Sequence, residues 1–426
     1  MARLYCRPRR RLEENGAEPR RPGTPFQIRG SNTGNPHGPG FPTLYRETTI
    51  MSSPHNGRAP TSIPIRRQKI PSGWNRSRRA FVQTALATAA LPGWGPLASA
   101  ARGGVAHSNR SANGPDVLLE RVEKIHADGR WNGRPSIFFW KNHYWIFFRS
   151  GSEHLSSDGR ISLLKSTANQ PRQWQLTEAL DTPGDDAEVH MLVTPARLFA
   201  YVVRCDAASQ RGDPIDTQVS VSDDGHHWSP PQPCYDPTFS WWKPVAHRGR
   251  YYVAADIMRG DRRVELLQST DGIRWQPVST ILQGAFTETS LLFLPDDSLL
   301  AFTRQGRLSI SKPPYTTWES SPINGLGGPA AALVGDTVLV AGRTSSESFP
   351  DDQPGTTRTG IFRLDREQKR LRWVTHMPLI WGRDVSYPDF HVLDKRRALI
   401  ACYDGQGYQR GAAKQADLLL ATLRLV

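Results

Sequence analysis

The sequence predicts an all-β fold, a six-bladed β-propeller over residues 116–426, and three observations favour it. Beyond Asp116 the period of an amphipathic helix is almost absent, and short runs of aromatic and β-branched residues alternate with Gly, Asp and Pro turns. A two-strand opening recurs six times along these residues. A turn motif that ends in tryptophan recurs at a spacing typical of propeller blades.

The two-strand opening is clearest at residues 137–140 and 144–148, which a hairpin turn at residues 141–143 joins. It returns at residues 189–204, 244–256, 289–304, 330–343 and 388–403. Each copy begins a blade of four strands and about 45 residues. We expect residues 117–122 to pair with residues 418–425 and so close the ring of blades.

The turn motif has the pattern S-x-D-G-x-x-W and occupies residues 222–228 and 269–275, with weaker echoes ending at Trp174, Trp318 and Trp373. Successive tryptophans are 54, 47, 43 and 55 residues apart. Ser and Asp side chains accept backbone N–H groups in such a turn, glycine supplies a positive φ, and tryptophan packs the outer hairpin. The motif resembles the Asp-box of sialidases and related propellers. A β-sandwich with Asp-Gly turns is the alternative interpretation.

Charge and cysteine content exclude several classes of protein. Residues 1–115 hold 18 Lys and Arg against 4 Asp and Glu, whereas residues 116–426 hold 36 of each. The part expected to fold is neutral, which argues against a nucleic-acid partner. Four cysteines without a CxxC or CxxH pairing argue against a disulfide scaffold and a zinc site, and no metal or organic cofactor is implied. No stretch reaches the roughly 18 apolar residues of a membrane helix.

The N-terminal part of the chain is expected to be a targeting segment rather than part of the folded domain. Residues 1–75 are rich in Arg, Pro, Gly, Asn and Ser without an apolar period, which predicts a disordered basic segment. Arg78-Arg79, an apolar run at residues 85–91 and small residues at 97–100 follow in order. Residues 76–101 therefore resemble a twin-arginine signal peptide, followed by a linker at residues 102–115. Met51 is a more natural start for such a signal than Met1, and a basic tail with an Ala-rich helix is the alternative.

This signal implies that the twin-arginine export machinery is a partner and that the chain folds before export. The mature protein is expected in the periplasm or secreted, without a membrane span.

Ionisable side chains flank the opening hairpins, where the loops at the channel entrance of a propeller build its site. They are Arg134, Arg149, Glu188, Arg204, Asp256, Glu288, Arg304, Arg343, Tyr387 and Asp404.

The order of these residues resembles that of exo-α-sialidases over essentially all of residues 116–426. Arg134 in Gly133-Arg134-Pro135 matches the arginine of the family's first blade, although the isoleucine of that motif is missing. Asp158 lies about two dozen residues later, where the family has an aspartate. Glu288 and Arg304 match a glutamate that opens a later blade and the arginine that ends the same hairpin.

The last blades complete the resemblance, with two departures. Arg358 and Arg343 compete for the place of the family's third arginine. Tyr387 matches the tyrosine that opens the last blade, and Asp404 stands where the family has a glutamate of longer reach. A plain turn aspartate is the alternative for Asp158, and ion pairs at the rim or between blades are the alternative for the arginines.

The resemblance implies a site for a sugar carboxylate, because guanidinium groups bind carboxylates bidentately. The residues that it assigns to substrate binding are Arg134, Arg304, Arg358, Arg343 and Asp404.

The resemblance also implies a tyrosine nucleophile. The phenol of Tyr387 is a weak nucleophile at its usual pKa near 10, so Glu288 would take its proton. A neutral phenol avoids the repulsion that an aspartate nucleophile would meet from the substrate carboxylate. Asp158, on a loop, would be the general acid. We expect Pro388 to bias Tyr387 toward extended backbone, and a separation of Tyr387 and Glu288 above about 6 Å would exclude this mechanism.

The sequence therefore predicts an exported glycoside hydrolase resembling an exo-α-sialidase, which cleaves a terminal acidic sugar from a glycan with retention. The sugar is sialic acid or another acidic or neutral sugar. A non-catalytic glycan-binding propeller and a scaffold propeller without a ligand are the alternatives. Trp131, Trp241 and Trp242 are candidates either for stacking on a sugar or for packing between blades.

Overall fold

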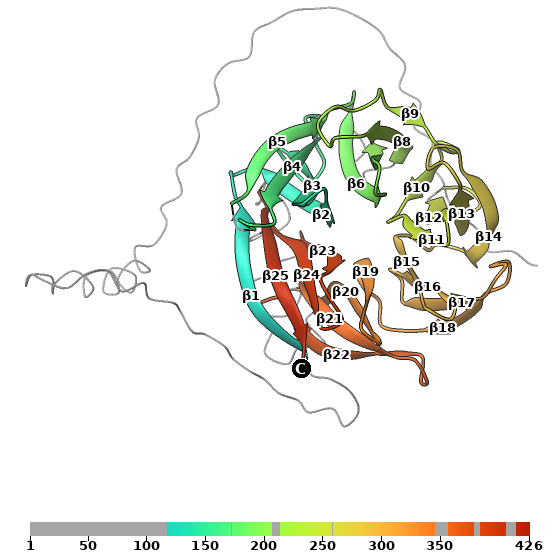
Figure 1. The fold of residues 1–426 in the computed structure, drawn as a ribbon. Coiled ribbons are helices and arrows are strands. Elements are labelled where there is room, and N and C mark those ends of the chain that lie inside the picture. The colour runs from blue at the N-terminus through green and yellow to red at the C-terminus, as the bar shows by residue number, and fades with distance from the viewer. Residues whose placement is uncertain are drawn as a thin grey trace, which may run out of the picture. The chain divides into compact units, whose positions relative to one another are not determined.

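The computed structural model describes residues 117–426 except 172, 207–213, 258, 346–356, 379–383 and 406–414. All regular elements of these residues are strands (Figure 1). Within the same residues no helix is long and apolar enough to cross a membrane. The expected disordered segment 1–75, signal 76–101 and linker 102–115 lie outside the described residues.

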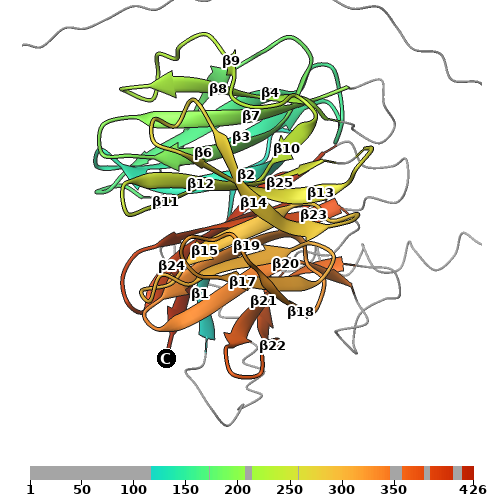
Figure 2. The same cartoon turned by 90° about the vertical axis from the view of Figure 1, so that its right-hand side faces the viewer.

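Six antiparallel sheets surround a common centre, which confirms the predicted six-bladed propeller (Figure 1; side view in Figure 2). Blades one and two consist of β2 (Trp131–Trp140), β3 (His143–Gly151), β4 (Arg160–Thr167) and β5 (Gln175–Leu180), then β6 (Asp185–Val193), β7 (Leu198–Cys205), β8 (Pro214–Ser222) and β9 (Gln232–Pro233). Blades three and four consist of β10 (Phe239–Trp241), β11 (Val245–His247), β12 (Arg250–Ile257), β13 (Arg263–Ser269) and β14 (Gln276–Gln283), then β15 (Thr289–Phe293), β16 (Leu299–Thr303), β17 (Arg307–Ser311) and β18 (Glu319–Pro322). Blade five consists of β19 (Gly327–Val334), β20 (Thr337–Ser345), β21 (Thr357–Asp365) and β22 (Arg370–His376), and blade six of β23 (Asp384–Val392), β24 (Arg397–Gly405), β25 (Asp417–Leu425) and β1 (Val117–His126).

The ring is closed by strands from the two ends of the propeller. β1 pairs antiparallel with β25, with Val117 opposite Leu425 and Val122 opposite Ala421 (Figure 1). The predicted closure is confirmed, and the ladder continues to His126. β1 thus covers the outer edge of β25, whose backbone groups would otherwise be open to pairing with another chain.

A hydrophobic cluster lies between each pair of neighbouring blades. Between blades one and two, for example, Trp145 and Phe147 pack with Val189 and Val202. A blade held between two neighbours buries both of its faces, which explains the nearly continuous apolar runs of its inner strands. Trp131, Trp241 and Trp242 are at most 2% exposed, so they pack between blades rather than present a face to a sugar.

The two full turn motifs sit where each blade meets the one before it. Ser222 Oγ accepts from the N–H of Gly225 at 2.8 Å, and Asp224 Oδ1 accepts from the next two N–H groups. Gly225 has φ 81°, and a Cβ there would lie 2.5 Å from the Trp145 ring of blade one. Gly272 repeats the arrangement against blade two. The glycine is therefore required by both the turn and the contact between blades.

Candidate active site

The inner strands of several blades begin with the same backbone irregularity. Register shifts lie at residues 133–136 in β2, 327–330 in β19 and 386–389 in β23, and in each the residue before a proline has a positive φ. These residues are Arg134 (55°), Gly328 (59°) and Tyr387 (45°), and Glu288, just before β15, has φ 49°. A bulge redirects a side chain relative to the regular strand. The bulges bring Arg134 and Tyr387 together, and Glu288, outside any register shift of β15, joins them through the Tyr387 hydroxyl.

The expectation that Pro388 keeps Tyr387 extended was wrong. With φ 45°, Tyr387 lies in the left-handed region, which the following proline disfavours. The reason is tertiary: the bulge in β23 and the bare backbone of Gly328, beneath the tyrosine ring, accommodate the turned conformation. Tertiary contacts outweigh the local bias of the proline.

Tyr387 and Glu288 form a hydrogen-bonded pair. The Tyr387 hydroxyl donates to Glu288 Oε1 at 2.6 Å, well inside the limit of about 6 Å set above. Glu288 Oε2 accepts from the Gly328 N–H at 2.8 Å. Arg304 Nη1 donates to Glu288 Oε1 and to the Tyr387 hydroxyl, the latter at 3.2 Å. The carboxylate is thus oriented to take the phenolic proton, and Arg304 faces the oxygen that would become negative.

The environment of Tyr387 keeps its phenol neutral in the free protein. The side chain is 6% exposed, and burial raises its pKa well above the ordinary value, with the charge of Glu288 adding to the rise. The guanidinium groups of Arg304, Arg343 and Arg134 oppose this rise. The charge of Glu288 in turn raises the pKa of Arg304. A phenolate forms here only when the proton passes to Glu288.

Three of the predicted arginines surround Tyr387. The Cζ atoms of Arg134 and Arg343 lie 5.5 and 5.4 Å from the centre of its ring, and Arg304 contacts its hydroxyl. Arg134 also lies 3.4 Å from Glu188 Oε1. Three like charges can gather in this way because carboxylates lie between them.

Arg358, the other candidate for the third arginine, lies elsewhere in blade five. It belongs to the third strand, β21, and its Nη1 is 3.0 Å from Nε2 of His376 on β22. Arg343 instead ends the hairpin of β19 and β20 opposite Gly327. The structure therefore brings Arg343 to the tyrosine and leaves Arg358 on the outer strands.

The Asp158 carboxylate binds residues of blade one rather than the Tyr387 and Glu288 pair. Asp158 Oδ1 accepts from the N–H and hydroxyl of Ser152 at 3.0 and 2.8 Å, and Oδ2 accepts from Arg130 Nη2 at 2.9 Å. The Asp158 side chain is 46% exposed. Asp404, opposite Val385 in blade six, is 2% exposed. The role of Asp158 as general acid and that of Asp404 in substrate binding stay predictions.

Asp384 is a member of the cluster that the sequence reasoning missed. Its Oδ2 accepts from Trp131 Nε1 and lies 2.7 Å from His154 Nδ1, and its Oδ1 accepts from the Tyr403 hydroxyl at 2.7 Å. Burial favours the neutral acid, but these hydrogen bonds hold the pKa of Asp384 well below its usual range. The signal was available: Asp384 opens the same inner strand as Tyr387. His154 and Gly328 were missed as well.

Trp242 occupies the centre of the ring between the blades. Its Nε1 donates to the carbonyl of Pro329 in blade five at 2.9 Å, and its ring lies 5.0 Å from that of His190 in blade two. It also meets the Tyr387 ring edge-on at 5.8 Å. Trp242 thus joins blade three to blades two, five and six. The more exposed members are Arg304 and His154, whose side chains are 37% and 33% exposed.

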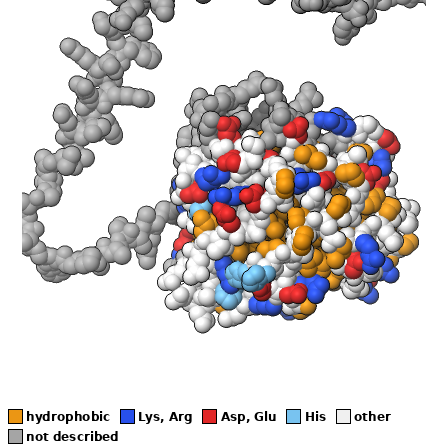
Figure 3. Space-filling model, turned by 90° about the horizontal axis from the view of Figure 1, so that it is seen from above, with side chains coloured by type: hydrophobic (Ala, Val, Ile, Leu, Met, Phe, Trp, Pro, Cys, Tyr) orange, Lys and Arg blue, Asp and Glu red, His pale blue; other side chains and the backbone are white. Residues whose placement is uncertain are grey.

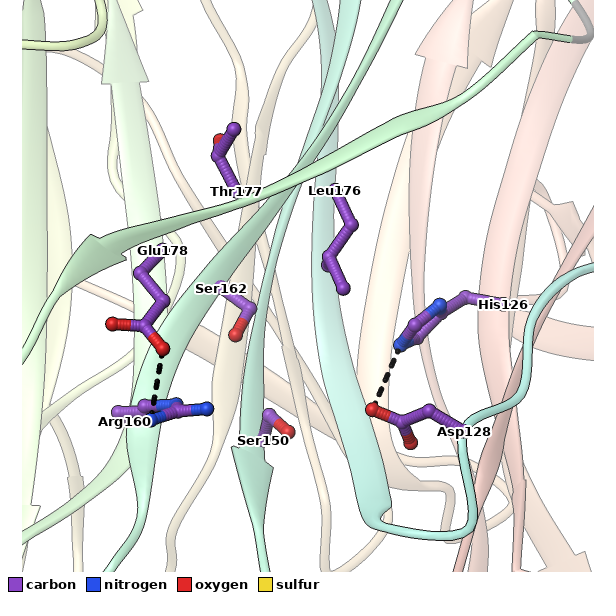
Figure 4. A pocket seen from close by; sticks show the side chains of 8 residues that line it. All are labelled: His126, Asp128, Ser150, Arg160, Ser162, Leu176, Thr177 and Glu178. Atoms are coloured by element: carbon purple, nitrogen blue, oxygen red, sulfur yellow. Dashed lines mark ion pairs between the residues drawn. The ribbon is translucent and has the colours of Figure 1, made fainter.

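A separate hollow of about 260 Å³ lies beside blade one (Figure 4). Two ion pairs line it, His126 with Asp128 at 3.4 Å and Arg160 with Glu178 at 2.9 Å. None of its lining residues belongs to the Tyr387 cluster. Among the residues that the structure describes, no group of three His, Cys, Asp or Glu side chains is arranged to hold a metal ion.

Solved structures share this fold at low sequence identity. A protein of unknown function from Dyadobacter fermentans is 16% identical, with a TM-score of 0.61 over 73% of this chain and 100% of its own. The endosialidase of phage phi92 is 13% identical, with a TM-score of 0.56 over 72% of this chain and 69% of its own. No protein-family model matches the chain, and no curated protein sequence matches it.

Trypanosoma rangeli sialidase is a further structural neighbour. Its complex with 2,3-difluorosialic acid, described as a covalent intermediate, is 13% identical with a TM-score of 0.52. The match covers 74% of this chain and 57% of the trypanosomal one. At this identity the likeness extends to the fold: the chain is a sialidase-like six-bladed propeller.

Proposed function

We propose that this protein is a retaining glycoside hydrolase of the exo-sialidase type, which cleaves a terminal acidic sugar from a glycan. The observation that carries the proposal is the 2.6 Å hydrogen bond from the Tyr387 hydroxyl to Glu288, with Arg134, Arg304 and Arg343 around the same ring. A buried tyrosine among arginines is an unusual way to build a core, because the charges of Arg134 and Arg343 must be largely desolvated. It is a suitable way to build a nucleophile for an anionic substrate.

The chemistry follows from the geometry. The three guanidinium groups attract a sugar carboxylate and place the anomeric carbon near the Tyr387 hydroxyl. As that oxygen attacks, Glu288 takes its proton and Arg304 stabilises the charge that develops. A proton donor for the leaving group is required on the open side of the cluster, where the loop at residues 152–158 lies.

Replacing Tyr387 by Phe tests the proposal. Tyr387→Phe keeps the ring and its packing but removes the attacking oxygen, so turnover of a fluorogenic sialoside should fall by about 10³-fold or more. A 2,3-difluoro sugar of the kind bound covalently in the trypanosomal structure should label Tyr387 in the wild type, as mass spectrometry would show, and not the variant. Tyr201→Phe is the matched control: its buried hydroxyl donates to the Gly272 carbonyl outside the cluster, so turnover should be unchanged.

Two outcomes would contradict the proposal. Full activity of Tyr387→Phe would exclude a tyrosine nucleophile. Binding of sialosides, ulosonates or uronates without turnover of any of them would instead make the protein a glycan-binding propeller.

A further inference from the structure

The loop at residues 152–158 directs two possible proton donors to different places. The Asp158 carboxylate stays on the loop itself, held by Ser152 and by Arg130. Burial opposes ionisation, but these hydrogen bonds hold the pKa of Asp158 well below its usual range. Asp158 therefore carries no proton near neutral pH, and its carboxylate binds Ser152 and Arg130.

His154, four residues earlier, enters the cluster instead. Its Nε2 lies 2.9 Å from Arg134 Nη2, its Nδ1 lies 2.7 Å from Asp384 Oδ2, and its ring meets the Trp131 ring edge-on at 4.8 Å. Because Arg134 can only donate, Nε2 accepts and Nδ1 carries the proton that Asp384 accepts. The imidazole thus stands between the buried arginine and a carboxylate, on the exposed side of the cluster.

Substrate geometry decides what this position means. In a 2-ulosonic acid glycoside the carboxylate and the leaving oxygen are bonded to the same carbon. In the proposed function Arg134 binds that carboxylate, so a side chain that touches Arg134 from the exposed side of the cluster comes within reach of the leaving oxygen. We propose that His154, rather than Asp158, is the proton donor to the leaving group in this site. The inference rests on the proposed function, and His154 is not among the site residues predicted from the sequence.

The two half-reactions balance in protons and bonds. In the first, the Tyr387 oxygen bonds to the anomeric carbon, its proton passes to Glu288, the bond to the leaving oxygen breaks, and His154 Nε2–H protonates that oxygen. In the second, His154 Nε2 takes a proton from water, whose oxygen bonds to the anomeric carbon. The bond to Tyr387 breaks, and Glu288 returns the proton to the phenolic oxygen.

Charges around His154 couple its protonation to substrate binding. In the free protein burial lowers the pKa of His154, Arg134 and Arg149 lower it further, and Asp384 opposes them. Glu188, which pairs with Arg134, also interacts with His154. A substrate carboxylate on Arg134 offsets the positive charge and leaves Asp384 to favour the imidazolium. Binding should therefore take up a proton.

The sign of the pH dependence follows. kcat/KM reports the free protein, in which protonated His154 is the active form and its pKa is below the ordinary value of about 6.5. kcat/KM should therefore be highest in acid and fall tenfold per pH unit above that pKa.

The test compares His154→Gln with Asp158→Asn, a matched change on the same loop, using one acidic sugar linked either to 4-nitrophenol or to a second sugar. A phenolate leaves without protonation, whereas a sugar alkoxide does not. His154→Gln should lose about 10²- to 10⁴-fold in kcat/KM on the sugar-linked substrate, but less than about tenfold on the aryl glycoside. The fall of kcat/KM above the pKa of His154 should disappear in this variant, and Asp158→Asn should resemble the wild type on both substrates.

If His154 only positions other groups, His154→Gln should lower kcat/KM equally on both substrates, which would overturn the proposal. A loss of kcat/KM in Asp158→Asn on the sugar-linked substrate alone would overturn it as well. An active wild type with an unaffected His154→Gln overturns the inference and leaves the proposed function standing. An inactive wild type overturns both. If His154→Gln does not fold, ¹³C-histidine NMR of the wild type gives the test. The pKa of His154 should rise when the protein binds a 2,3-unsaturated ulosonate, and no rise overturns the proposal.

Discussion

At the scale of single residues, the cluster depends on unfavourable backbone conformations. Arg134, Glu288 and Tyr387 all have φ between 45° and 55°, a region that costs a non-glycine residue about 1–3 kcal/mol. The surroundings hold each of them in place. For Glu288, its N–H donates to the buried Asp256 Oδ1 at 3.0 Å. Strain of this kind persists where the direction of a side chain matters more than stability, which fits a site and not a core.

Gly328 lies beneath the ring of Tyr387, the proposed nucleophile. Its replacement should distinguish the effect of backbone strain from that of a contact with this ring. A Cβ at Gly328 would lie 2.5 Å from Tyr387 Cγ, at a φ of 59°. Gly328→Ala should therefore cost about 2–4 kcal/mol from backbone strain and overpacking, and should displace the Tyr387 ring. Gly249→Ala, at φ 75° with no atom within 4 Å of the added Cβ, should cost about 1–2 kcal/mol and leave turnover unchanged.

Chemical denaturation and turnover of the two glycine variants decide the matter. Equal activity of Gly328→Ala and Gly249→Ala would show that the contact between Gly328 and Tyr387 has no part in the reaction.

Arg343 and Arg358 were both candidates for the third arginine of the site, and the choice between them gives a second prediction at this scale. Arg343→Gln removes a guanidinium beside Tyr387, so it should weaken binding of a carboxylate-bearing sugar by about 10- to 150-fold, which is 1.5–3 kcal/mol. Binding of the same sugar with its carboxylate reduced to an alcohol should weaken less than about threefold. Arg358→Gln is the matched control and should change neither affinity, as calorimetry would show. Equal losses on both sugars would make Arg343 structural.

The candidate site was predictable where a residue type and its place in a blade were both visible. Tyr387, Glu288 and Arg304 were found because each flanks an opening hairpin, a rule that needs only the order of strands. Asp384 follows the same rule and was overlooked. His154 was not predictable, because the path of the loop at residues 152–158 determines which of its side chains reaches Arg134. That path depends on tertiary contacts rather than on spacing.

At the scale of elements, the blade pattern was predictable because alternation and turns are local. The inner strand of blade three was the exception. It is divided into β10 and β11, with Trp242 between them. Pro244, just before β11, has no N–H for the ladder, and the tryptophan side chain reaches Pro329 across the ring instead.

Ring closure by β1 gives a prediction at this scale. Deleting residues 117–126 removes the partner of β25 and the packing of Val117, Leu119 and Val122 against blade six, worth about 5 kcal/mol. The unfolding temperature should fall by about 10 °C or more, and the exposed edge of β25 should promote aggregation. Lys124→Ala is the control, since its ion pair with Asp417 is partly exposed and worth under about 1 kcal/mol. Unchanged unfolding after the deletion would show that β25 needs no partner.

At the scale of the whole molecule, the basic excess of the sequence belongs to residues 1–115, and residues 116–426 are neutral. Figure 3 shows acidic and basic side chains interspersed on one face of the propeller. The net charge of the propeller therefore does not steer an anionic glycan, and the arginines around Tyr387 supply its attraction to the site. Association should depend only weakly on salt beyond about 0.15 M, where the Debye length is about 8 Å.

Ring closure also bears on export, which leads to the last prediction. β25 pairs with β1, which comes from the other end of the propeller, so the ring closes only after β25 has been synthesised. A route that transports folded protein suits such a domain, and Arg78-Arg79 resembles its signal. Replacing both arginines by Lys should leave precursor in the cytoplasm, whereas the wild type should appear outside it, with a new N-terminus near Ala101. Arg66-Arg67, which no apolar run closely follows, is the matched control: its replacement by Lys should leave export unchanged. Immunoblots of cell fractions and N-terminal sequencing give the answer. Export that survives loss of Arg78-Arg79 would remove the twin-arginine signal, and with it the reason to place this protein outside the cytoplasm.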